Sequence, residues 1–218
     1  MLKFPVSIDH SNSDKYEHVT SFISRQSPPF DGVRIAKEIS TNCGSIYYEM
    51  EVEDILYYWK LATEFGNIQH QKIENYIRKN QSCDFDEFFQ QNNIGFENSY
   101  SEIKLTSDIY QLTGTADIIV REINEDKTIY RIHDIKTYKN ITDEKILKAS
   151  VQILLYCMML NNHLGENEIA IPGKILHISN VSHPTNQDIS TWKISKPYFV
   201  NFDKNAIKEV KKYLGNEK

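Results

Sequence analysis

The sequence predicts an α/β fold in which a central mixed β-sheet is flanked by helices. Apolar residues recur at helical spacing within residues 51–79 and again within residues 144–160. Between them, residues 116–123 (ADIIVREI) and 128–135 (TIYRIHDI) form two strand-like runs separated by a polar turn at 124–127. The resulting order is helices, three strands, helix, strand, helix, which favours a sheet packed between helical layers.

The N-terminal part of the chain is predicted to contain two short helices. Residues 1–18 are polar and lack periodicity, so we expect them to be flexible. A helix begins near Val19, with Thr20 as its expected N-cap. Two prolines and a glycine predict a turn at residues 27–32, and residues 33–42 have the apolar spacing of a second helix.

Residues 51–79 carry a stronger helical pattern, with one apolar face before Gly66 and another after it. We interpret Gly66 as separating two helices or as allowing a close approach to a neighbouring element. His70 then lies in the first turns of the second helix. Residues 80–98 are expected to form a short acidic helix followed by a loop.

The period changes after Glu102, where the strands begin. Residues 103–112 suggest an interrupted strand, and the runs 116–123 and 128–135 are expected to pair as an antiparallel hairpin. The apolar helix 144–160 is predicted to be buried on more than one side. A strand at 173–181 and an amphipathic helix at 203–214 complete the chain, and no linker divides residues 1–218, which we interpret as one domain.

Composition narrows the class of protein. The 218 residues are 40% hydrophobic and 25% charged, as in an ordinary globular protein, and the net charge of −5 argues against a surface that coats nucleic acid broadly. The longest apolar run, 153–160, is too short to span a membrane. The N-terminus lacks the apolar stretch of a secretory signal, so we expect a protein that is not secreted and works in the cytoplasm or in a nuclear or viral DNA compartment.

Two aspartates at the ends of adjacent predicted strands point to chemistry. The carboxylates of Asp117 and Asp134 would repel each other unless a cation lay between them. Mg²⁺ and Mn²⁺ take oxygen ligands, to which the backbone carbonyl of Ile135 can add, and such ions promote phosphodiester hydrolysis. Lys136 lies on the same strand face as Asp134, because side chains alternate, and is placed to orient water or to balance phosphate charge.

Further motifs surround this D-x-K sequence. They are G-x-x-x-H (Gly66 to His70), an acidic position (Glu102), G-x-x-D (Gly114 to Asp117) and Q-x-x-x-Y (Gln152 to Tyr156). With them the chain resembles the RecB-type nucleases of the PD-(D/E)XK superfamily, and it is most similar in pattern to compact single-domain exonucleases such as the mitochondrial genome maintenance exonuclease. The resemblance extends from Val19 to the strand near Ile175.

That resemblance implies a restriction-endonuclease-like core and metal-dependent cleavage of DNA, often single-stranded and from an end. Asp117, Asp134 and His70 become metal ligands, and Lys136 becomes the catalytic lysine. Gln152 and Tyr156, one turn apart on their helix, are expected to face the site and bind substrate. We also expect Thr137 to contact phosphate and Glu102 to act as an accessory acidic group.

Two departures from the family pattern matter. Ala116 replaces the proline that names the superfamily, which leaves the ligands in place. The three cysteines, at positions 43, 83 and 157, do not include a C-x-x-C pair, so an iron–sulfur cluster is not expected.

The leading functional hypothesis is a Mg²⁺- or Mn²⁺-dependent DNase, expected to be monomeric, that processes DNA ends alongside replication or repair proteins. A cap-snatching type of RNA endonuclease shares a histidine, acidic ligands and a lysine on a related core, although the Q-x-x-x-Y motif favours the DNA branch. A non-catalytic nucleic-acid-binding domain of the same fold is the third hypothesis. The alternative to all three is that Asp117, Asp134 and Lys136 form only a cross-strand charge cluster on a surface hairpin.

Overall fold

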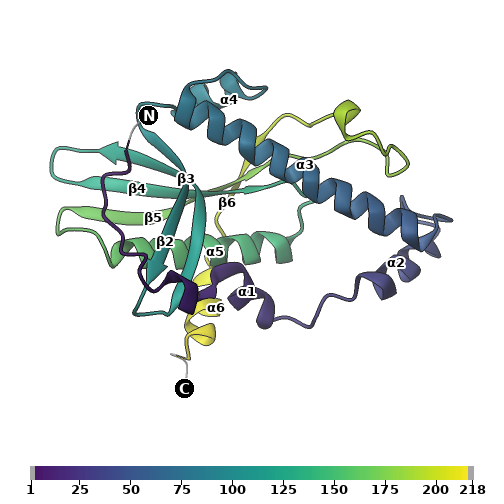
Figure 1. Cartoon of the computed structure of the whole chain (residues 1–218), viewed down its shortest axis with the longest axis horizontal. Coiled ribbons are helices and arrows are strands. Elements are labelled where there is room, and N and C mark those ends of the chain that lie inside the picture. Colours follow the sequence, from purple (N-terminus) through teal and green to yellow (C-terminus); the bar gives the residue numbers. More distant parts are fainter. Residues whose placement is uncertain (1–2, 216–218) are drawn as a thin grey trace.

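A six-stranded mixed sheet forms the centre of the computed structural model, which describes residues 3–215 (Figure 1). Its strands are β1 (Glu17–His18), β2 (Ser99–Ser107), β3 (Leu112–Ile123), β4 (Thr128–Lys136), β5 (Glu168–His177) and β6 (Tyr198–Asn201). The path runs β1-β3-β4-β5-β6, with β2 paired to the other edge of β3. The pairs β1–β3 and β4–β5 are parallel and the others are antiparallel. The predicted mixed α/β fold and the 123–128 hairpin are therefore confirmed.

Helices cover both faces of this sheet. They are α1 (Val19–Arg25), α2 (Gly32–Ser40), α3 (Val52–Lys79), α4 (Asp86–Gln91), α5 (Asp143–Asn161) and α6 (Ala206–Tyr213), with short 3₁₀ turns at Ser13–Lys15 and Ile189–Thr191. The C-terminal half of α3 packs on one face, where Ile73 and Ile77 meet Ile118 and Leu176. The apolar helix α5 is buried on the other face between the sheet and the helices α1 and α6.

The predicted break at Gly66 is wrong, because α3 continues through it as one helix of 28 residues. The alternative interpretation of this glycine, a close approach, is confirmed. A Cβ atom at Gly66 would lie 2.7 Å from Oγ1 of Thr137, just after β4. Glycine is unfavourable inside a helix by about 1 kcal/mol relative to alanine. The close packing against Thr137, and not helix propensity, therefore explains the glycine at position 66.

Several element boundaries differ from the expectations. The N-cap of α1 is His18, so Thr20 lies inside the helix. The strand expected at 173–181 instead runs from Glu168 to His177. It begins earlier than expected because Pro172 and Gly173, which often interrupt strands, lie within it. The short strands β1 and β6 were not predicted from the sequence, and the closing helix α6 was. In the segment 3–18, Phe4 packs edge-to-face on Tyr100 at 5.0 Å, so that segment has contacts although we expected it to be flexible.

Among residues 3–215, no helix combines the length and the apolar composition that crossing a lipid bilayer requires.

Candidate active site

The site lies at a fork between β3 and β4. The ladder between these strands ends at the pair Ile118–His133, although β4 remains paired to β5 through Lys136. Asp117 and Asp134 are the next residues on the two strands and lie on either side of the opening. The Ile135 amide donates a 2.7 Å hydrogen bond to Oδ2 of Asp117, so a side chain bridges the fork where backbone pairing stops. This divergence is what turns a hairpin end into a site.

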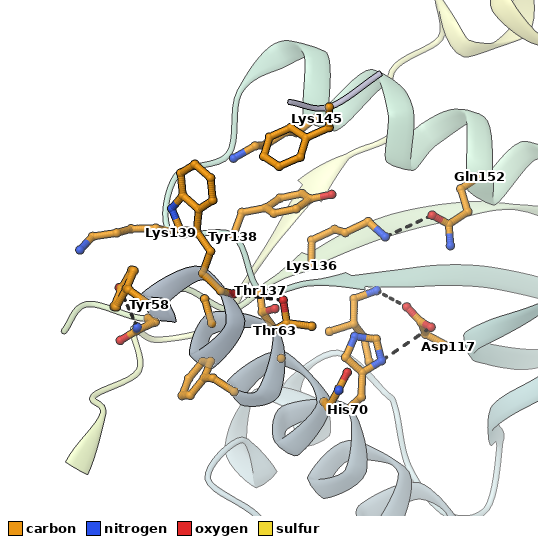
Figure 2. Close-up of a pocket in the computed structure, with 18 of the residues that line it drawn as sticks. Tyr58, Thr63, His70, Asp117, Lys136, Thr137, Tyr138, Lys139, Lys145 and Gln152 are labelled. Carbon is orange, nitrogen blue, oxygen red and sulfur yellow. Dashed lines mark hydrogen bonds and ion pairs between the residues drawn. The ribbon is translucent and has the colours of Figure 1, made fainter. Parts of the chain in front are cut away.

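Three side chains from three elements meet at the fork. One ligand atom each of His70 (α3), Glu102 (β2) and Asp117 (β3) lie within 4.8 Å of one another. Nδ1 of His70 is 3.6 Å from Oε1 of Glu102. It is 3.7 Å from Oδ1 of Asp117 (Figure 2). One imidazole nitrogen and two carboxylates form a donor set that suits Mn²⁺ or another divalent cation.

A hydrogen-bonded chain holds the lysine on the other strand of the fork. Nζ of Lys136 lies 2.8 Å from Oδ2 and 3.1 Å from Oδ1 of Asp134, and it donates a 3.2 Å hydrogen bond to Oε1 of Gln152. Nε2 of Gln152 in turn donates to the Tyr156 hydroxyl at 3.3 Å. The predicted common face of Asp134 and Lys136 is therefore confirmed.

Gly114 lets this chain approach the sheet. A Cβ atom there would lie 2.7 Å from Cε1 and 3.0 Å from the hydroxyl oxygen of Tyr156. Tyr156 is 2% exposed, and its role in binding substrate stays a prediction. Its ring is enclosed between α5 and β3, and its hydroxyl positions Gln152. Gln152 itself lines the pocket, as does Thr137.

Burial sets the electrostatics of the fork. Burial raises the pKa of Asp117, and the charges of His70 and Lys136 only partly counteract it. Burial together with the neighbouring Asp117 carboxylate also raises the pKa of Asp134, in spite of the Lys136 ammonium group. These groups carry more negative charge than Lys136 neutralises, which favours a bound cation.

The two basic side chains respond in the opposite sense. Burial lowers the pKa of Lys136, but Asp134 and Asp117 outweigh it and raise that pKa overall, so the lysine carries its proton at neutral pH. Burial likewise lowers the pKa of His70, while Glu102 and Asp117 raise it to a net value above the ordinary one. A cation bound at His70 would compete with a proton for the imidazole nitrogen.

Glu102 reaches the cluster through an unusual backbone. Its φ is +51°, in the left-handed region that a residue with a side chain seldom adopts, and it lies inside β2 opposite Asp117. Arg78, near the end of α3, stabilises this conformation. Its guanidinium donates to the Ser101 carbonyl at 2.7 and 3.2 Å and to the Glu102 carbonyl at 3.2 Å. Glu74 holds Arg78 through a 2.9 Å ion pair.

Arg78 was not predicted from the sequence. It lies eight residues, about two helical turns, beyond His70, so it shares a helix face with the histidine, and this spacing is the one signal that pointed to it. Its role depends on a long-range contact that periodicity does not reveal.

Part of this site opens into one pocket of about 720 Å³. Its polar end contains His70, Asp117, Lys136 and Gln152, and its other end contains Tyr58, Tyr138, Lys139 and Lys145 (Figure 2). The structure thus brings His70, Glu102, Asp117 and Lys136 together as predicted from the sequence. Asp134 is adjacent but pairs with Lys136 and is not a member of the three-residue donor cluster. The Ile135 amide contacts the site, and a ligand role for its carbonyl stays a prediction.

Comparison with known families gives one match. Residues 49–212, from before α3 to within α6, match the PD-(D/E)XK nuclease superfamily. A search of curated proteins finds no significant match to the chain. The matched range includes every residue of the fork and the chain of contacts behind it.

Proposed function

The chain belongs to the PD-(D/E)XK nuclease superfamily, and from this premise we propose that it is a Mg²⁺- or Mn²⁺-dependent DNA nuclease acting on strand ends. The observation that carries the proposal is the fork itself. His70 and Asp117 of the three-residue donor cluster line the same pocket as the protonated Lys136, and Glu102 lies behind them. Enzymes of this superfamily hydrolyse phosphodiester bonds with divalent metal ions, and the fork offers both the ligands and the excess negative charge that hold such an ion.

The proposed ligands are His70, Glu102 and Asp117, with Asp134 and the Ile135 carbonyl beside them. The donor set fits a divalent cation, because carboxylate oxygens and one imidazole nitrogen converge within 4.8 Å and the buried carboxylates lack sufficient positive partners. A cation bound there would supply Lewis-acid chemistry, lowering the pKa of water and neutralising charge on the phosphate.

Lys136 is the proposed catalytic residue on the protein side. As an ammonium group held by Asp134 and Gln152, it has three N–H donors and two protein partners within the described part of the chain. The remaining N–H can bind a non-bridging phosphate oxygen or the attacking water, so it would stabilise the negative charge that develops at phosphorus. Gln152 and Tyr156 keep the amine in this position, which makes them positioning residues.

DNA is proposed over RNA because the chain carries the Q-x-x-x-Y pair of the DNA-cleaving branch that it resembles. Action at ends is proposed from its resemblance to the compact exonucleases. Thr137 lines the pocket next to Lys136 and is the proposed phosphate contact on that side. Protein partners from replication or repair and a monomeric state complete the proposal.

One assay tests the proposed activity. End-labelled linear DNA and circular DNA, each single- and double-stranded, are incubated with Mg²⁺ or Mn²⁺ and either wild type or Lys136→Ala, with RNA of the same sequence as a parallel substrate. We expect wild type to degrade linear DNA and leave circles intact, and Lys136→Ala to be inactive while keeping its far-UV spectrum. Cleavage of RNA alone would favour the cap-snatching hypothesis, and cleavage of nothing would favour the non-catalytic one.

A further inference from the structure

The pocket has an aromatic end that the cleavage chemistry does not use. Phe30, in the linker between α1 and α2, is 74% exposed, which is unusual for so large an apolar side chain. Its ring lies 5.8 Å from that of Trp59 on α3, and Tyr47, in the loop before α3, packs against Trp59 at 6.4 Å. All three line the same pocket as His70 and Asp117. We name these three residues the aromatic platform.

Two lysines share this pocket with the platform and with residues of the fork. Lys139 and Lys145 line the pocket, and Figure 2 shows them at the end away from Asp117 and Gln152. Within the described part of the chain neither ammonium group forms an ion pair. Lys139 donates to the Ser182 carbonyl, and Lys145 donates to the Asn140 carbonyl while lying 4.5 Å from the Tyr138 ring centre. Their charges are thus available to an anion that enters the pocket.

One of these lysines is close to the fork along the chain. Lys139 is three residues beyond Lys136, so the two Cα atoms are at most about 10 Å apart. A cleavage site, two lysines and aromatic rings in one pocket match the scissile phosphate, the adjoining phosphates and the bases of a polynucleotide.

Only an unpaired strand offers base faces to such rings. In a duplex the faces are covered by neighbouring base pairs, whereas bases of a single strand stack freely on aromatic side chains without regard to sequence. A duplex would leave the rings without a matching partner.

We propose that the aromatic platform binds bases of an unpaired nucleic-acid strand while Lys139 and Lys145 bind its phosphates, so that the pocket selects single strands. This inference rests on the proposed nuclease function and adds the residues that choose the strand. The recognition chemistry, base faces and phosphates, is shared by single-stranded DNA and RNA.

Binding is measured in a Lys136→Met background, which removes the proposed catalytic group, by fluorescence anisotropy with Mn²⁺ present. The probes are a labelled single-stranded DNA, an RNA of the same sequence, the blunt duplex, and an abasic strand with the same number of phosphates. The test variants are Trp59→Ala and Phe30→Ala. The matched control is Tyr57→Ala, since Tyr57 is a 45% exposed aromatic residue on the same helix that does not line the pocket.

We expect each platform variant to weaken binding of the single strand about 5- to 150-fold, the range for losing one stacked base. The platform variants should bind the abasic strand and the duplex as tightly as the Lys136→Met protein does. Tyr57→Ala should match the Lys136→Met protein on every probe. Lys139→Met and Lys145→Met should each reduce the salt dependence of single-strand binding by about 0.7 in log–log slope. Comparing DNA with RNA shows which unpaired strand the platform accepts.

The inference is overturned if both platform variants bind the single strand as tightly as the Lys136→Met protein does. It is equally overturned if they lose as much affinity for the abasic strand, because the rings would then act on something other than bases. Phe30→Ala keeps this result interpretable even if Trp59→Ala is unstable, since Phe30 is largely exposed. Wild-type cleavage without any platform effect would refute this inference alone, whereas platform-dependent binding without any cleavage would refute the proposed nuclease function alone.

Discussion

Replacing Gly114 with alanine tests whether the site depends on the contact between β3 and α5. The added methyl group would lie 2.7 Å from Cε1 of Tyr156, whose ring is enclosed and cannot move away freely. Overpacking of this kind costs about 1–3 kcal/mol, and displacing the tyrosine hydroxyl removes a hydrogen bond from Gln152 worth about 1 kcal/mol. Replacing a glycine inside a strand by alanine is itself stabilising by about 0.5–1 kcal/mol, which offsets part of this cost. The free energy of unfolding should therefore fall by about 1–3 kcal/mol.

The measurement is urea denaturation followed by circular dichroism, with cleavage of labelled DNA as a second readout. Gly95→Ala is the matched control, because a Cβ atom at Gly95 meets no atom within 4 Å. In a Tyr156→Leu background the clash is relieved, so Gly114→Ala should then cost under about 1 kcal/mol. A stability change for Gly114→Ala within about 0.5 kcal/mol of wild type, or an equal loss in the Tyr156→Leu background, would show that the ring does not depend on this glycine.

Three further predictions follow from packing and charge. Gly66→Ala alone should leave the free energy of unfolding nearly unchanged, because the gain in helix propensity of about 1 kcal/mol is offset by displacement of Thr137. In a Thr137→Ala background the same substitution should stabilise the protein by about 1 kcal/mol in urea denaturation. Equal effects in both backgrounds would contradict the contact between Gly66 and Thr137. Arg78→Met should weaken Mn²⁺ binding measured by calorimetry, because Glu102 loses the partner that holds its left-handed backbone, and unchanged affinity would remove Arg78 from that role. Burial lowers the pKa of His177, whose Nε2 donates to a carbonyl and whose Nδ1 is buried without a hydrogen-bond partner among residues 3–215. The folded state therefore resists protonation, and stability should fall as pH drops below about 6.5, by at most about 1.4 kcal/mol per pH unit. His177→Gln should flatten this dependence, whereas an unchanged slope would assign it to another group.

Sequence patterns predicted the hairpin and the helix α5 well because both are strongly periodic and local. Residues 124–127 join two complementary strands, and α5 is apolar on nearly every side, so neighbouring residues alone decide these elements. The D-x-K sequence likewise places Asp134 and Lys136 on one face through strand alternation, which needs no knowledge of the rest of the chain.

Features that depend on distant contacts were misjudged or missed. Gly66 suggested a helix break, because the Thr137 side chain that fits against it lies about 70 residues later in the sequence. The sequence pattern also does not reveal that the buried Tyr156 ring packs against Gly114. The left-handed backbone of Glu102 has no sequence signature, and only the folded position of Arg78 explains it.

The fork accounts for why these elements must come together. A hairpin supplies two carboxylates, yet the third and fourth functional groups arrive from β2 and α3, and the lysine is held by α5. The motifs recognised in the sequence are therefore points where separate elements touch, and Gly66 and Gly114 mark two close approaches between them.

The central claim is that a divalent cation held by His70, Glu102 and Asp117 enables this chain to cut DNA. Its most direct test is the rate of release of labelled nucleotides from linear single-stranded DNA as Mn²⁺ is titrated, compared between wild type, Asp117→Asn and the surface variant Lys148→Met. We predict cleavage that rises with Mn²⁺ and stops with a chelator for wild type and Lys148→Met, and a loss of at least about 100-fold for Asp117→Asn, the scale expected when a group that supports transition-state charge is removed. Cleavage by Asp117→Asn at the wild-type rate and with the same Mn²⁺ dependence would contradict the claim.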